Sequence, residues 1–177
     1  AINVIGTGPQ SNEASATPVA PPTLTATVTA SPTSAVAPLP VTLTATAGGT
    51  ATGTISYSFW WNCSSAADTY AQASLDCGGA LTAPSPSGTC VADIGGKGYK
   101  CDGMPGTDNP KSIPSHSYTP AGTYTGKVII ERQTLSKGAI TSPSISVTAA
   151  ITTTIASGID PGSVPIGPGV VIPTDLD

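Results

Sequence analysis

The sequence predicts an all-β fold, and three observations lead to that prediction. Only 9% of the 177 residues are charged, against about 25% in ordinary soluble domains. The chain contains 20 glycines and 18 prolines, which disfavour long helices. Apolar residues alternate with Thr and Ser in several stretches, as is typical of strands that bury one face. We therefore expect a β-sandwich whose surface is rich in hydroxyl groups.

The first expected element is an extended N-terminal segment, residues 1–22. Ile2, Val4 and Ile5 form a short apolar patch, and a linker rich in Pro, Ala, Ser and Thr follows it. Such a composition predicts extended chain that packs poorly on its own domain. The sequence begins at Ala1, which we interpret as the mature end of an exported protein after removal of a signal peptide.

Three strands are expected between residues 23 and 61, separated by turn signals in AVAPLP and GGTATG. Each shows the alternation of a half-buried strand. Their inward-facing residues are Leu24, Ala26, Val28 and Ala30 in the first, Val41, Leu43 and Ala45 in the second, and Ile55, Tyr57, Phe59 and Trp61 in the third.

Residues 62–110 show weak periodicity, and we interpret them as an insertion stapled by disulfides. It contains all four cysteines: Cys63, Cys77, Cys90 and Cys101. An even number of cysteines in a Gly/Ser-rich region indicates disulfides and an oxidising compartment. Their spacing is too wide for the CxxC knuckles of a zinc site. Three pairings are open, and we favour Cys63–Cys77 with Cys90–Cys101 because each closes a short loop. A short hairpin between 90–94 and 99–101 is also expected.

Regular alternation returns at Ser112. The sequence predicts a short strand, a turn at PAG, and a strong strand in which Val128 and Ile130 face one way and Lys127 the other. A turn around Leu135–Gly138 should then lead into the last strand.

The last predicted strand is unusually long. From Ile145, apolar residues occupy most odd positions as far as Ile159, a run that could extend for about 50 Å. A sandwich at residues 23–148 needs only its first half, so Ile151, Ile155 and Ile159 lack an evident place in their own domain. A Pro/Gly-rich tail completes the C-terminal segment, residues 149–177.

The region from about 23 to 148 resembles PKD-type domains, a branch of the immunoglobulin-like β-sandwiches. The resemblance rests on ASPTSAVAPLPVTLTATAGGTATGTISYSF at 30–59 and SHSYTPAGTYTGKVIIER at 115–132. It is also similar to PKD-like repeats of bacterial surface proteins, which carry a similar FWWNC stretch. The resemblance implies extracellular display, adhesion or assembly. Where many PKD domains have Trp-Asp-Phe-Gly-Asp-Gly, this chain reads FWWNCS at 59–64, so no role of that acidic motif is carried over.

The residues that could carry chemistry favour structural roles, and we expect no enzyme, no cofactor and no metal site. His116 is the only histidine and precedes a tyrosine-containing turn. No nucleophile elbow is present, and the aspartates of the insertion lie among turn formers without calcium-loop spacing. Asn62-Cys63-Ser64 fits a glycosylation sequon. The net charge of −4, with only 6 Lys and Arg, argues against nucleic-acid binding. No apolar run is long enough for a transmembrane helix.

Trp60 and Trp61 are adjacent, so on a strand they point to opposite faces. One should lie in the core. The other is either covered by the insertion or exposed to a partner or a sugar.

These features favour an extracellular, pilus-like subunit that assembles head-to-tail with copies of itself by donating a β-strand from a terminal segment. The candidate donor residues are Ile2, Val4 and Ile5 or, preferably, Ile151, Ile155 and Ile159. The alternative is an adhesive or carbohydrate-binding module of a larger cell-surface protein, with the tails as linkers.

Overall fold

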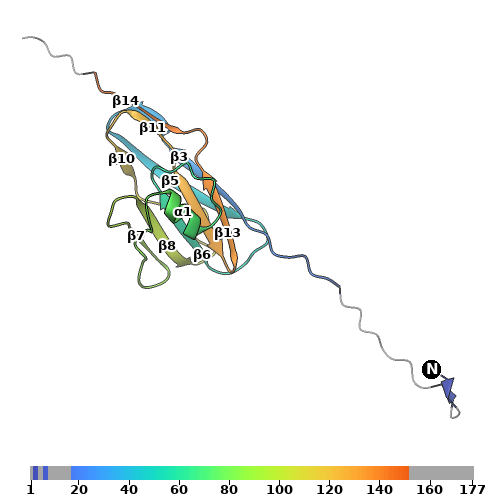
Figure 1. Cartoon of the computed structure of the whole chain (residues 1–177). Helices are drawn as coiled ribbons and strands as arrows, with labels where there is room; N and C mark the ends of the chain where they lie inside the picture. Colours follow the sequence, from blue (N-terminus) through green and yellow to red (C-terminus); the bar gives the residue numbers. More distant parts are fainter. Residues whose placement is uncertain (1, 4–5, 8–16, 152–177) are drawn as a thin grey trace, which may run out of the picture.

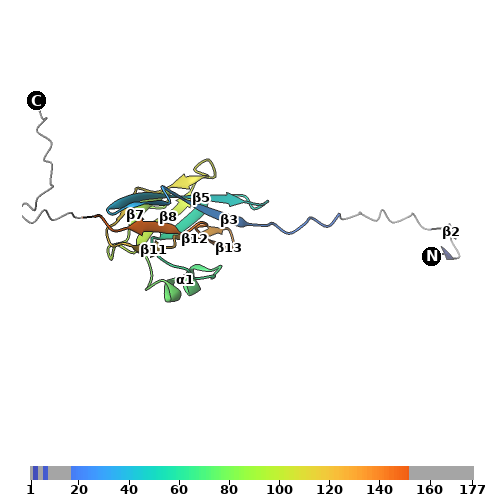
Figure 2. The ribbon, with the colours of Figure 1, turned by 90° about the horizontal axis from the view of Figure 1, so that it is seen from above.

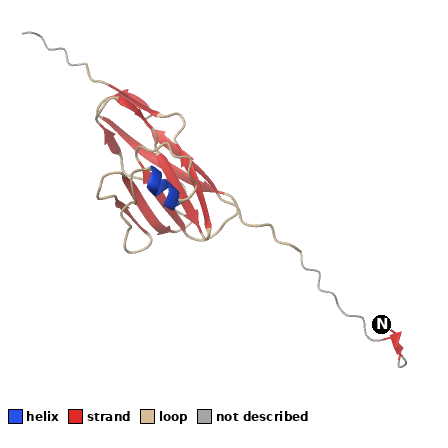
Figure 3. Cartoon of the chain, viewed as in Figure 1, coloured by secondary structure: helices blue, strands red, loops and turns tan. Residues whose placement is uncertain are grey.

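The structure is a computed structural model of the 177-residue chain, and it describes residues 2–3, 6–7 and 17–151. The described part is an all-β sandwich with one short helix, α1 (Tyr70–Asp76) (Figure 3). Within it, no helix is long and apolar enough to cross a membrane.

The first sheet forms around β5 (Leu39–Gly48), whose alternating burial matches the alternation of apolar residues with Thr. β3 (Thr25–Ser31) pairs with one side of β5. The other side pairs with β9 (Lys111–Ser112) and then with β10 (His116–Tyr118). All of these pairings are antiparallel.

The second sheet has five antiparallel strands in the order β13-β12-β6-β8-β7. Their bounds are Leu135–Ile140, Lys127–Arg132, Ile55–Trp60, Gly98–Met104 and Thr89–Ala92. A smaller sheet consists of β11 (Gly122–Tyr124), β14 (Ile145–Thr148) and β4 (Ser34–Val36), with β4 parallel to β14.

The main core lies between the sheets and is lined by the residues that the alternation predicted. From β5 and β6 they include Val41, Leu43, Ile55, Tyr57 and Phe59, all fully buried. Val128 and Ile130 of β12 join them. Burial of Tyr57 raises the pKa of its phenol to about 12.

The chain enters and leaves the sandwich at opposite ends (Figures 1 and 2). Residues 17–24 lead into β3 at one pole, and residues 149–151 leave β14 at the other. This placement gives the domain a head and a tail along its long axis.

The structure departs from the sequence prediction in the region of β13. Residues 135–138 were expected to form a turn, and they belong to a strand paired with β12 along its whole length. The turn lies one step earlier, at Gln133, which adopts a left-handed φ of 55°. Gly138 lies within this strand. A side chain does not fit there, because a Cβ would overlap the carbonyl of Ala67 and Nζ of Lys127.

The last strand is also shorter than the expected run of about fifteen residues. β14 ends at Thr148, and residues 149–151 are neither strand nor buried. The alternation past Thr148 therefore does not continue the strand in the described part of the chain, because no partner strand lies beside it there. Residues 152–159 lie outside the described residues.

The insertion and the N-terminal segment contain more pairing than expected. The expected hairpin is present as β7 and β8, and β8 pairs directly with β6 within the five-stranded sheet. Near the N-terminus, β1 (Ile2–Asn3) pairs with β2 (Gly6–Thr7) within its own chain.

Candidate functional site

The outer face of the five-stranded sheet is covered by a segment that we call the flap, residues 62–82. It carries α1, and Figure 2 shows α1 standing off one face of the strands. The Thr69 hydroxyl caps the helix by accepting a hydrogen bond from the Gln72 N–H. The disulfide between Cys63 and Cys77 ties the start of the flap to the end of α1.

Trp60 lies under the flap and is 1% exposed. Its ring is 5.8 Å from the ring of Tyr70 and belongs to a second cluster with Ala73, Leu81 and Ile129. Cover by the insertion, the favoured outcome for one tryptophan, is confirmed.

Trp61 lies on the core side, is 7% exposed and stacks on His116 at 4.9 Å. With both tryptophans buried, the idea that one of them presents its ring face to a sugar from an open sheet surface is wrong.

The flap also closes the free edge of β13 through Asp68. Its carboxylate accepts a hydrogen bond from the Gly138 backbone N–H at 3.0 Å and pairs with Lys137 Nζ at 2.5 Å. The Ser136 hydroxyl donates to the Asp68 carbonyl at 2.6 Å. The hydrogen bond from Lys137 and that from Gly138 hold the pKa of the Asp68 carboxyl below its usual value. A backbone donor of the edge strand is thus occupied by a side chain.

Lys127 is a buried cation on the face of β12 opposite the core. Alternation predicts its direction but not its burial. Its side chain runs under the flap, is 1% exposed, and donates from Nζ to the Ala67 carbonyl at 2.6 Å. Burial lowers the pKa of this amine. With Gly138 and Ile140 it lines a pocket of about 210 Å³ beneath residues 64–66.

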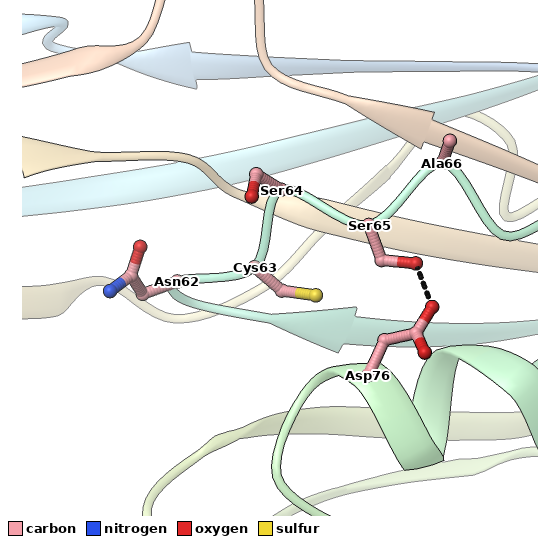
Figure 4. A pocket seen from close by; sticks show the side chains of 6 residues that line it. All are labelled: Asn62, Cys63, Ser64, Ser65, Ala66 and Asp76. Carbon is pink, nitrogen blue, oxygen red and sulfur yellow. Dashed lines mark hydrogen bonds between the residues drawn. The ribbon is translucent and has the colours of Figure 1, made fainter.

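An open polar pocket of about 450 Å³ also borders this segment (Figure 4) and is lined by residues 62–66 and Asp76. The Ser65 hydroxyl donates to Asp76 at 2.5 Å, and Gln72 Nε2 donates to the same carboxylate at 2.8 Å. These hydrogen bonds lower the pKa of Asp76. Since the single histidine, His116, stacks on Trp61 elsewhere, the Ser65–Asp76 pair has no imidazole and braces the flap.

Another concave site lies at the open side of the sandwich, and we call it the side groove. It has a volume of about 320 Å³. It is lined by Trp61, Ala92, Asp93, Gly96, Gly98, Tyr99, Pro114, Ser115 and His116. Its surface is mostly apolar and aromatic, and burial lowers the pKa of His116, which favours the neutral imidazole.

Asp93 holds the rim of the side groove. Burial opposes its ionisation, but hydrogen bonds from Thr82 N–H, Lys97 N–H and the Thr82 hydroxyl outweigh burial and lower the pKa of the carboxyl. These bonds join the end of the flap to the turn between β7 and β8. The disulfide between Cys90 and Cys101 fastens β7 to β8. Both disulfides follow the pairing that we favoured.

The remaining acidic residues of the insertion are paired with lysines. Lys100 lies 2.5 Å from Asp102, and Lys111 lies 3.3 Å from Asp108. In the part of the chain that the structure describes, no three His, Cys, Asp or Glu side chains gather as a metal site.

Of the candidate donor residues, Ile151 is 92% exposed and makes no part of the core. Ile2 lies in β1, opposite Thr7. Val4, Ile5, Ile155 and Ile159 lie outside the described residues.

Comparison with protein-family models, with curated proteins and with solved structures found no match to this chain.

Proposed function

We propose that this chain is an extracellular structural subunit that assembles head-to-tail into a filament or surface array by donating a β-strand from a terminal segment. The observation that carries the proposal is the exit of the two tails from opposite poles of one sandwich (Figure 1). Each tail contains apolar residues beyond the domain, and Ile151 is exposed. A head-to-tail contact does not close on itself, so it propagates as a fibre.

The finer fold assignment belongs to the same proposal: an immunoglobulin-like sandwich of the PKD type. Two features support it. β4 pairs in parallel with the final strand β14, and the Tyr124 hydroxyl donates to the Pro120 carbonyl at 2.9 Å, the contact of a tyrosine corner. Extracellular placement is supported by the two disulfides.

The test is sedimentation and negative-stain microscopy of the full chain beside the variant Ile151→Asp with Ile155→Asp. We expect filaments from the full chain and monomers from the variant, because two charges would fall on the apolar face of the donated strand. The matched control is Thr152→Asp with Thr154→Asp, which adds the same charge at the alternate positions and should still assemble. A monomeric full chain under all conditions would refute self-assembly, and assembly of the isoleucine variant would refute donation by the C-terminal segment.

A carbohydrate-binding module is the second candidate, and the aromatic lining of the side groove favours it. Sugars stack on exposed aromatic faces, and Tyr99 and His116 are half-buried there. If the chain has this function, it should be a monomer that binds glycans on a glycan microarray. The Tyr99→Ala variant should lose that binding.

A further inference from the structure

We propose that the side groove, together with the free edge of β9 and β10, is the acceptor site for residues 151–159 of a second copy of this chain. This inference rests on the proposed function and assigns its docking site. The bound segment would add a strand beside β10 and lay its isoleucines against Tyr99 and Ala92.

The two sheets are unequal in width, and the side groove lies where they fail to overlap. The first sheet is three strands wide, because β9 and β10 both pair with the same side of β5 and β3 pairs with the other. The second sheet is five strands wide. β3 lies against β12 and β13, so the surplus of the wider sheet falls at β7 and β8.

The inner face of β7 and β8 is therefore incompletely covered at this side. Register pairs Cys90 with Cys101 and Ala92 with Tyr99 on that face. Cys101 is buried in the core, Cys90 and Tyr99 are half-buried, and Ala92 is exposed. A strand placed beside β10, about 4.8 Å away, would cover these residues across the usual gap of about 10 Å between sheets.

The edge itself is available for pairing. β9 and β10 pair with β5 on one side, and no strand of the described residues pairs with their other side. An edge with a row of unpaired backbone groups accepts a strand from another chain. At β13, by contrast, Asp68 occupies the Gly138 N–H.

Residues 151–159 fit this site in pattern and are long enough to cover it. They span about 30 Å when extended, whereas the edge from Lys111 to Tyr118 lies opposite residues 39–45 of β5, about 23 Å of strand. Their odd positions read Ile, Thr, Ile, Ser, Ile, and no charge occurs before Asp160. One face of the strand would thus meet apolar groove and the other would meet solvent.

The occupant comes from a second copy because the described end of the chain leads away from its own sandwich. Residues 149–151 leave the pole beyond β14 (Figure 1), and Ile151 is 92% exposed.

The experiment uses the full chain with the photo-crosslinker p-benzoylphenylalanine at Ala92 or, separately, at Ser115, both exposed on the groove. Labelled (¹⁵N) and unlabelled copies are mixed, irradiated after assembly, and mapped by mass spectrometry. We expect crosslinks between isotopically different copies that join the groove to the peptide containing residues 149–177. The same probe at Thr27, on the exposed face of β3, should not give them.

A second measurement compares Ala92→Arg with Thr27→Arg in the full chain. Ala92→Arg should raise the protein concentration needed for assembly about tenfold or more, since it puts a charge into the contact, and Thr27→Arg should leave it unchanged. Circular dichroism and disulfide mapping verify that both variants fold.

The outcomes separate this inference from the proposed function. If filaments form but their crosslinks lie outside the groove and Ala92→Arg does not change assembly, the acceptor site is wrong. Head-to-tail assembly is then still supported. Crosslinks confined to single copies show a tail folded onto its own groove and overturn the inference. A chain that stays monomeric and binds glycans through the groove overturns both.

Discussion

The two margins of the five-stranded sheet differ in whether another part of the chain covers them. At β13 the flap covers the edge, with Asp68 on the Gly138 N–H and Lys127 on the Ala67 carbonyl. At β7 and β8 the hairpin projects past the narrower sheet and leaves a groove lined by Tyr99 and His116. Exposed edges invite strand addition. Covering the β13 margin removes one site of strand addition, and the groove at the other margin lies beside the free edge of β9 and β10 in the first sheet.

The largest expected effect contrasts an apolar residue under the flap with an apolar residue in the open hairpin. Trp60→Ala should lower the free energy of unfolding by about 3–5 kcal/mol, because Trp60 is buried under the flap. Ile94→Ala, in the turn between β7 and β8, should change it by less than about 0.5 kcal/mol, because Ile94 is exposed. Denaturant unfolding of the two variants measures both. Equal losses would show that the flap does not seal the sheet.

A methyl group added at the closed margin should have the next largest effect. Gly138→Ala forces a Cβ against the Ala67 carbonyl and Lys127 Nζ, and overpacking of this kind costs about 1–3 kcal/mol. Gly122→Ala in β11 is the matched control, since its Cβ would meet only ordinary contacts. Thermal unfolding of both variants is the measurement. If Gly138→Ala is as stable as Gly122→Ala, the flap must be able to move away from β13 at little cost.

Opening the closed edge should change association more than stability. Asp68→Ala removes an exposed ion pair and one hydrogen bond and should cost about 1 kcal/mol or less. It frees the Gly138 N–H, so we expect irregular aggregates on sedimentation. Asp68→Asn is the control, because its amide oxygen can still accept from Gly138. If Asp68→Ala sediments as the parent does, the aspartate does not protect this edge.

The smallest expected effect is a pH dependence of flap stability. The folded-state pKa of Asp68 is lowered by Lys137 and Gly138, so its contribution is present above the unfolded value of about 3.9 and is lost as pH falls through the folded pKa. The stability difference between the parent and Asp68→Asn should therefore shrink below about pH 4. Unfolding curves from pH 7 to pH 2 test this, and a difference that stays undiminished down to pH 2 would contradict it.

Much of the fold was predictable, because alternation along a strand reports directly on one buried face. It identified β3, β5, β6 and the inward residues of β12. It also indicated that only one of the adjacent tryptophans would lie in the core, and left open whether the insertion covers the other. Strand β13 was not predicted because a glycine such as Gly138 usually indicates a turn. Here the glycine leaves room for the flap, whose Ala67 is far away in sequence.

The side groove could not be predicted for a similar reason. Trp61, Tyr99 and His116 come from three distant segments, and only the pairing of β8 with β6 and of β10 with β5 brings them together. No local sequence pattern indicates how far one sheet extends beyond the edge of the other. The burial of Lys127 likewise depends on the flap, although alternation predicts that Lys127 lies opposite the core-facing residues of β12.

Hydrogen–deuterium exchange of assembled and unassembled full chain tests most directly whether the edge of β9 and β10, beside the side groove, receives the added strand. Assembly should slow amide exchange in residues 111–118, and exchange in β13 should stay unchanged. Slowing at β13 with none at residues 111–118 would contradict the account.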